Sequence, residues 1–177
     1  MTAQQLRQLA NALTLGRALI GLPLLVALQH LAAALAWGLL LLGGISDGAD
    51  GWLARRAGGG STWGARVDPL TDKILISAPL LWLGQQGVLP LWAIWLMLAR
   101  ELIVTGWRTG LSSGGPASFS AKAKTSLQFI ALLLLIWPPL WPAATLLHGL
   151  GWWLFWPSLS LALWSATGYL IQASNKA

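Results

Sequence analysis

The chain has 177 residues, of which 56% are hydrophobic and 9% are charged, and its formal net charge is +6. Soluble domains carry about 25% charged residues, so this composition excludes an ordinary soluble protein and indicates an integral membrane protein. The chain has no cysteine, which excludes a disulfide framework, a thiol nucleophile and a cysteine-based metal site. Its basic residues are scattered in ones and twos between apolar stretches, which argues against nucleic-acid binding.

The predicted elements are all helical. A short amphipathic helix over residues 3–13 is expected to lie on the membrane surface, with Leu6, Leu9, Ala10 and Leu13 facing lipid. Six apolar segments then approach the roughly 20 residues that a helix needs to cross a bilayer. They cover residues 15–31, 32–55, 65–83, 89–111, 121–147 and 152–173. The sequence thus predicts an all-α integral membrane protein with six transmembrane helices plus the interfacial N-terminal helix, in one domain over residues 1–177.

Prolines and glycines punctuate these segments. Pro138, Pro139 and Pro142 fall within the fifth predicted span and Pro157 within the sixth, where we expect them to kink the helices. Two stretches rich in glycine and serine, 57–64 and 111–118, are predicted to be loops on the same side of the membrane.

The basic residues define a topology. The connections after the first, third and fifth spans contain no Lys or Arg, whereas all eleven fall on the other side or in the span ends that face it. Because cytoplasmic loops carry the excess of Lys and Arg, both termini are predicted to be cytoplasmic. The protein itself is predicted to lie in the inner (plasma) membrane. The eleven residues are Arg7, Arg17, Arg55, Arg56, Arg66, Lys73, Arg100, Arg108, Lys122, Lys124 and Lys176.

Four of the five acidic residues lie within 26 positions, namely Asp47, Asp50, Asp68 and Asp72. The first two are three residues apart and the last two are four apart, so each pair shares one face of its helix. The glycine-rich segment between the pairs lets the end of the second span lie beside the start of the third. We therefore expect four carboxylates to converge near the cytoplasmic surface.

Carboxylates at membrane depth need compensation, and three interpretations are open. Divalent cations such as Mg²⁺ or Mn²⁺ prefer oxygen ligands, and two ions about 3.5–4 Å apart can stabilise a phosphoryl transfer. The acids could instead form salt bridges with neighbouring basic residues, or a proton relay in a transporter. A transporter should carry charges near mid-membrane, but here every acid lies toward one side. The basic candidates for salt bridges are Arg55, Arg56, Arg66 and Lys73.

The stretch DGADGWLARRAGGGSTWGARVDPLTD has the pattern D-x2-D-G-x2-A-R-x8-G-x3-D-x3-D. This pattern resembles the signature of the CDP-alcohol phosphotransferases, membrane enzymes of phospholipid synthesis with a six-helix fold. The positions that match it are Asp47, Asp50, Gly51, Ala54, Arg55, Gly64, Asp68 and Asp72.

The resemblance implies a reaction in which a CDP-linked donor, usually CDP-diacylglycerol, loses CMP when an alcohol hydroxyl attacks its β-phosphorus. It implies two Mg²⁺ or Mn²⁺ ions held by Asp47, Asp50, Asp68 and Asp72, with Asp72 also the general base. It further implies a homodimer and a set of CDP-binding residues: Asn11, Thr14, Gly51, Ala54, Arg55, Ser61 and Gly64.

Two further segments bear on the acceptor. ARELIVTGWR (99–108) and AKAKTSLQ (121–128) resemble the corresponding segments of bacterial phosphatidylglycerophosphate synthases within this family. The resemblance implies sn-glycerol 3-phosphate as the acceptor, with Glu101 orienting an arginine or binding a glycerol hydroxyl. Inositol phosphate, or phosphatidylglycerol as in a cardiolipin synthase, is the alternative acceptor. The residues implied in binding the acceptor phosphate are Arg100, Arg108, Lys122 and Lys124, although the positive-inside rule alone would also account for these charges.

Overall fold

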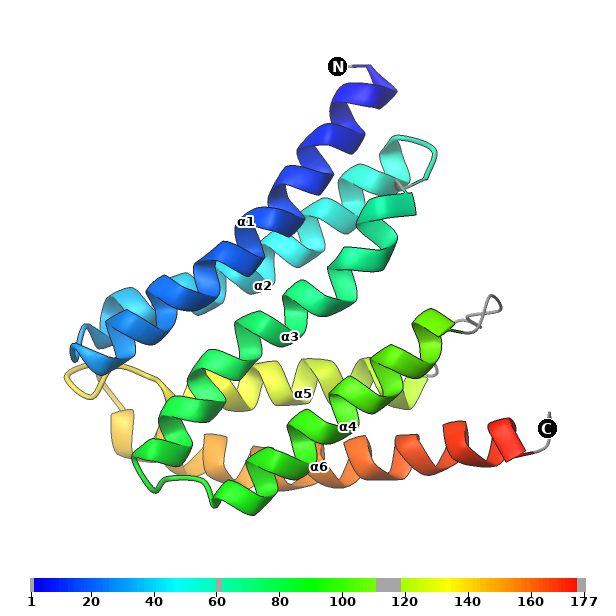
Figure 1. The fold of residues 1–177 in the computed structure, drawn as a ribbon. Helices are drawn as coiled ribbons and strands as arrows, with labels where there is room; N and C mark the ends of the chain where they lie inside the picture. Colours follow the sequence, from blue (N-terminus) through cyan, green and yellow to red (C-terminus); the bar gives the residue numbers. More distant parts are fainter. Residues whose placement is uncertain (1, 60–61, 111–118, 175–177) are drawn as a thin grey trace. The chain divides into compact units, whose positions relative to one another are not determined.

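The computed structural model describes residues 2–59, 62–110 and 119–174, and every regular element within them is a helix (Figure 1). The predicted all-α class is therefore confirmed for this part of the chain. The chain divides into two compact units, residues 1–82 and 83–177. The helices are α1 (Ala3–Gln29), α2 (Ala33–Arg56), α3 (Thr62–Gln85), α4 (Leu91–Gly110), α5 (Phe119–Leu135) and α6 (Ala144–Ser174).

The N-terminal helix differs from the prediction, because α1 runs unbroken where a surface helix (3–13) and a separate span (from 15) were expected. Thr2 caps its start: the hydroxyl of Thr2 accepts from the backbone N–H of Gln5, and the side chain of Gln5 accepts from that of Thr2. Residues 3–15 contain neither glycine nor proline, so nothing interrupts the helix between the two predicted segments. Ala10, predicted to face lipid, is buried.

In the first unit, α1 and α2 lie side by side and α3 packs against both at glycines (Figure 1). A methyl group at Gly21 of α1 would lie 3.2 Å from the side chain of Ile74, and one at Gly43 of α2 would lie 2.4 Å from that of Leu75. The two glycines therefore let α3 approach its neighbours closely at the level just beyond the aspartates.

Helix α1 has an inverted distribution of polarity. Its outward face is an apolar stripe at helical spacing, in which Leu19 and Leu22 are 74% and 69% exposed and Leu15 and Val26 are also exposed. Its inward face buries two polar side chains, Thr14 and Arg17. Of the helices in the described ranges, α1 is also the one that is long and apolar enough, by length and composition, to cross a membrane. An apolar outside around a polar inside suits a helix surrounded by lipid.

The second unit departs from the predicted spans. Helix α5 ends at Leu135, before the three prolines that were expected to kink it, and α6 starts at Ala144 instead of 152. Proline has no backbone N–H and its ring clashes with the preceding turn, so three prolines within five residues end the helix. The connection 136–143 carries them, and His148, predicted to lie in a loop, lies on α6. Its Nε2 donates to the carbonyl of Trp137 at 2.8 Å. Pro157 lies inside α6, as predicted.

Helix α6 packs against both α5 and α4. Against α5 the contact is made at Gly151, where a methyl group would lie 2.9 Å from the carbonyl oxygen of Ala131 and 2.9 Å from the backbone nitrogen of Leu135. Against α4, the rings of Trp92 and Trp156 lie 5.8 Å apart. A glycine contact on one side and an aromatic contact on the other thus fix α6 between its neighbours.

The close approach at Gly151 yields a test. We expect Gly151→Ala to lower the melting temperature in detergent, because the backbone of α5 must shift by several tenths of an ångström and overpacking costs about 1–3 kcal/mol. Gly149→Ala is the matched control on the same helix, since nothing lies within 4 Å of a methyl group there. That variant should be neutral or stabilised by up to about 1 kcal/mol through helix propensity. Equal melting temperatures for the two variants would contradict the packing.

Candidate functional site

The end of α2 is shaped to return the chain into α3. Gly58 and Gly59 have φ angles of +74° and +127°, a region that favours glycine, and the N–H of Gly59 donates to the carbonyl of Ala54 at 3.0 Å. Arg7 of α1 then binds this turn, donating from Nε to the carbonyl of Gly59 at 3.1 Å and from Nη2 to that of Ala57 at 3.3 Å. The turn between the two aspartate pairs is therefore anchored to α1.

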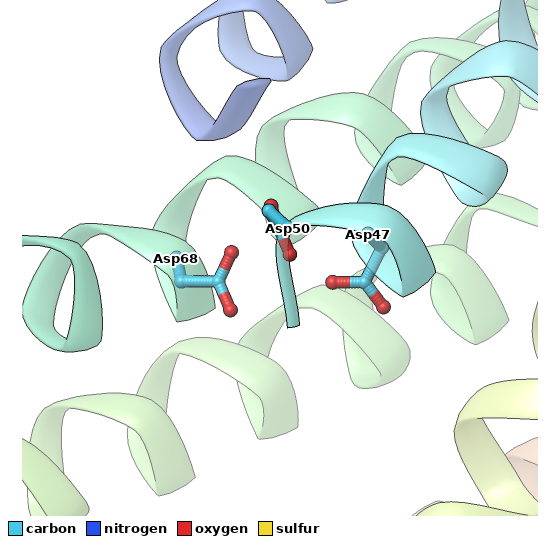
Figure 2. Close-up of side chains that lie close together, drawn as sticks. All are labelled: Asp47, Asp50 and Asp68. Atoms are coloured by element: carbon cyan, nitrogen blue, oxygen red, sulfur yellow. The ribbon is translucent and has the colours of Figure 1, made fainter. Parts of the chain in front are cut away.

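Three carboxylates meet beyond this turn. Asp47 and Asp50 extend from α2 and Asp68 from α3, and Figure 2 shows the carboxylates of Asp47 and Asp68 pointing toward each other with that of Asp50 between them. One oxygen from each lies within 4.8 Å of the other two. Ligands of a single Mg²⁺ lie about 3–4.2 Å apart, given metal–oxygen distances of about 2.1 Å. The cluster therefore has the donor atoms and nearly the spacing that a divalent cation requires.

Arg17 of α1 binds all four aspartates. Its Nη1 donates to Oδ1 of Asp47 at 2.9 Å and to Oδ1 of Asp68 at 3.0 Å. The same nitrogen donates to Oδ1 of Asp72, and Nη2 donates to Oδ2 of Asp50. Asp72 thus joins the cluster through Arg17, from one helical turn beyond Asp68. The predicted convergence of the four carboxylates is confirmed, and all four contact one arginine.

The charges that the described contacts bring together do not balance. In them, four carboxylates face one guanidinium, which is a formal excess of three negative charges. The side chain of Arg17 is 0% exposed, whereas those of Asp47, Asp68 and Asp72 are 52%, 38% and 32% exposed. The arginine therefore lies behind the carboxylates, and the exposed side of the cluster is the side that a further cation can reach.

Polar groups on α1 and α2 support the cluster. The hydroxyl of Thr14 lies 3.2 Å from Oδ2 of Asp50 and donates to it, and Nε of Arg17 donates to the hydroxyl of Ser46 at 3.3 Å. Ser46 in turn donates to the carbonyl of Gly43 at 2.7 Å. Thr14, predicted as a CDP contact, thus lies at the carboxylates themselves.

The remaining signature residues line the end of α2 and the start of α3. Arg55 is exposed, and a methyl group at Gly51 would lie 3.4 Å from its Nη1, so residue 51 must be small for this arginine to lie across it. Arg56, the neighbouring candidate for a salt bridge, is exposed with its guanidinium 5.0 Å from the ring of Trp52. The other predicted CDP contacts Asn11, Ala54 and Gly64 are half-buried, and Ser61 lies outside the described residues.

The second unit buries a charge network of its own. Arg100 donates from Nη1 to Oε1 of Glu101 at 2.9 Å, and Nζ of Lys124 donates to the same oxygen. Arg100 also donates from Nε to the carbonyl of Ala162 at 2.8 Å and from Nη2 to the hydroxyl of Ser165. The network joins α4, α5 and α6, and all three charged side chains are buried.

Two of the predicted acceptor contacts, Arg100 and Lys124, therefore share the carboxylate of Glu101. The other two, Arg108 and Lys122, lie on α4 and α5, and their side chains are outside the described part of the structure. Gln128, one turn after Lys124 on α5, is buried and its Nε2 has no hydrogen-bond partner. An amide donor thus lies buried and unsatisfied on the same helix face as Lys124.

Comparison with known proteins gives the family. The model of the CDP-alcohol phosphatidyltransferase family matches residues 7–164. The chain belongs to this family. This match confirms the resemblance found in the signature. Members of the family are transferases and are generally membrane-bound.

Three relatives illustrate the range of the family. A probable phosphatidylglycerophosphate synthase of Mycobacterium tuberculosis (strain H37Rv) is 40% identical over 142 residues, which are 76% of this chain and 68% of the relative. A CDP-diacylglycerol–glycerol-3-phosphate 3-phosphatidyltransferase of Bacillus subtilis (strain 168) is 34% identical over 150 residues, 82% of this chain and 71% of the relative. A putative cardiolipin synthase of M. tuberculosis (strain H37Rv) is 32% identical over 163 residues, 85% of this chain and 76% of the relative.

Arg17 is the residue in contact with the aspartates that the sequence analysis did not single out. Its signal was present, because a lone arginine inside an otherwise apolar span requires an anionic partner. It also lies three residues after Thr14 and so shares that residue's helix face. The signature directed attention to the arginines beside the aspartates, whereas the one that binds them comes from a different helix.

The network around Glu101 yields a second test. We expect Glu101→Ala to destabilise the protein by about 3–5 kcal/mol, because it leaves Arg100 and Lys124 buried without their shared carboxylate. Thermal unfolding in detergent measures this, and Leu102→Ala is the matched control, since Leu102 is exposed on the same helix. Adding Lys124→Met to Glu101→Ala should restore part of the loss by removing one unpaired cation. A double variant no more stable than Glu101→Ala would contradict the pairing.

Proposed function

We propose that this chain is a phosphatidylglycerophosphate synthase that transfers the phosphatidyl group of CDP-diacylglycerol to sn-glycerol 3-phosphate and releases CMP. The observation that carries the proposal is the convergence of the four signature aspartates, three of which have partly exposed side chains. The choice of acceptor is supported by the relatives that bear this activity in their names. The family match favours such a transferase over a cation or proton-coupled transporter.

The roles of the aspartates follow from their positions. Asp47, Asp50 and Asp68 would hold divalent cations, Mg²⁺ or Mn²⁺, and Asp72 would complete the ligand set of two such ions. Bound there, the ions would supply positive charge to the donor's diphosphate and the leaving CMP. Asp72 reaches the cluster from one helical turn beyond Asp68 and remains partly exposed, so its carboxylate is available to an incoming hydroxyl.

In the proposed step, the acceptor hydroxyl oxygen forms a bond to the β-phosphorus while the bond from that phosphorus to the oxygen of CMP breaks. Asp72 takes the hydroxyl proton, and CMP leaves with the bridging oxygen. Arg55 is exposed at the end of α2 and suits a two-pronged contact with phosphate, while Gly51 keeps space beneath it. Asn11, Thr14, Ala54, Ser61 and Gly64 complete the proposed CDP contacts.

The acceptor phosphate would be bound by Arg100, Arg108, Lys122 and Lys124. Two of these residues, Arg100 and Lys124, lie together in the described network, where both contact Glu101. The unsatisfied amide of Gln128 offers a further donor on the face of Lys124.

A second candidate function is supported by the relative named as a putative cardiolipin synthase, whose match extends over more of this chain. In that reaction phosphatidylglycerol replaces glycerol 3-phosphate as acceptor, and the donor and the aspartates keep their roles. Inositol phosphate is a third acceptor with the same anionic chemistry. The identity of the acceptor is therefore the part of the proposal that assay must decide.

We further propose six membrane-spanning helices in a single family domain, with both termini and the aspartates toward the cytoplasm of the inner membrane, and a homodimer as the working form. The orientation is supported by the loop charges, because the connections 30–32, 86–90 and 136–143 contain no Lys or Arg among the eleven in the chain. Lipid contact is supported by the apolar stripe on α1.

An acceptor competition assay tests the proposed activity. Purified protein with Mg²⁺, CDP-diacylglycerol and labelled glycerol 3-phosphate should release CMP and form labelled phosphatidylglycerophosphate. Asp50→Asn, which alters the most buried of the four carboxylates, serves as the inactive control. Release of CMP only with phosphatidylglycerol or with inositol phosphate would show that the proposed acceptor is wrong while leaving the family reaction intact.

The base role of Asp72 is tested separately. We expect Asp72→Asn to lower turnover about 10²–10⁴-fold, the usual contribution of a general base, while Mn²⁺ binding is retained in part through the other three carboxylates. Ser77→Ala on the same helix is the control, since its hydroxyl donates to the carbonyl of Ile74 away from the cluster. Turnover of Asp72→Asn near that of the control would remove Asp72 from the base role.

A further inference from the structure

The proposed reaction assigns no part to Arg17. It is the one residue whose side chain binds Asp47, Asp50, Asp68 and Asp72 within the described structure, and it comes from α1, outside the signature. Its side chain is 0% exposed, so it is part of the interior of the first unit. Two helices supply the anions, and the third supplies the cation.

We propose that Arg17 is the positioning residue of the metal site: it is an internal counter-ion that holds the four carboxylates together from behind, before divalent cations bind in front. This inference rests on the metal-binding part of the proposed function. Without a positive charge among them, four carboxylates at this spacing would repel one another and drive α2 and α3 apart.

The geometry supports a position behind the carboxylates. Nη1 contacts a single oxygen, Oδ1, of each of Asp47 and Asp68. A carboxylate has two oxygens and about four lone-pair sites, so an arginine on one oxygen does not prevent a cation from binding the other. The side chains of these two aspartates are 52% and 38% exposed, whereas that of Arg17 is 0% exposed, so solvent and ions reach the carboxylates and not the guanidinium.

The number of charges in the described contacts also matters. There, one guanidinium offsets one of the four negative charges, which reduces the repulsion among the carboxylates without neutralising them. Arginine suits this role better than lysine, because its planar fork of donors reaches several carboxylates at once, whereas an ammonium group is a compact point charge. If Arg17 were removed, the cluster would depend more strongly on divalent cations for its stability.

The test measures stability and cation binding, without substrate. In EDTA, Arg17→Gln should melt at a lower temperature than the wild type. Added Mn²⁺ should raise its melting temperature by more than it raises that of the wild type, and calorimetry should show Mn²⁺ binding tightened at least about tenfold, since a repelling charge has gone. Arg7→Gln is the matched control on α1, because Arg7 binds backbone carbonyls of the turn and not the carboxylates. Its response to Mn²⁺ should equal that of the wild type.

Each possible outcome supports or contradicts a stated part of the proposal. A cation-induced rise in Arg17→Gln no larger than in Arg7→Gln would overturn the role of Arg17, as would weaker Mn²⁺ binding. If Arg17→Gln does not fold, Arg17→Lys carries the test: the ammonium reaches fewer carboxylates, so its cation-induced rise should exceed that of the wild type, and an equal rise would overturn the proposal. A wild type that binds no Mn²⁺ would instead remove the metal site itself, and neither result depends on which acceptor the enzyme uses.

Discussion

The interaction on which the first unit depends is the contact of one buried guanidinium with four carboxylates. Burying an unpaired charge in a membrane protein is costly, so α1, α2 and α3 can bury their polar residues only if those residues meet. The glycines at 21 and 43 allow this meeting, because they let α3 lie close enough for Asp68 and Asp72 to reach Arg17. Arg7 ties the turn at the end of α2 to α1.

The second unit also buries a network of charges, in which the signs are reversed. There, Glu101 is the shared anion and Arg100 and Lys124 are the cations, so the described network keeps a positive formal charge where the first unit keeps a negative one. In the proposed function, the negative cluster would bind divalent cations and the basic residues of the second unit would bind the acceptor phosphate.

Much of this could be predicted from sequence, for reasons that are local. The pairs Asp47–Asp50 and Asp68–Asp72 share helix faces because of their spacing alone, and the intervening glycines indicate a turn. Two features were not predicted. Helix α1 is continuous because no glycine or proline occurs between residues 3 and 15, and α5 ends at Leu135 because three prolines follow it and act together. The place of Arg17 could not be predicted from spacing, since its partners lie about 30 to 55 residues away along the chain.

The lengths of the helices have a consequence for the lipid. Arg17 lies twelve residues before the end of α1, which is about 18 Å along the axis, and Asp50 lies seventeen residues after the start of α2, about 26 Å. Both lengths are shorter than the roughly 30 Å of bilayer hydrocarbon. With the outer ends of α1 and α2 placed at the outer boundary of the hydrocarbon, the proposed orientation puts the carboxylates several ångströms below the inner boundary. A donor lipid would then lower its diphosphate beneath the plane of the neighbouring headgroups to react, while its acyl chains stay in the leaflet in which it arrived.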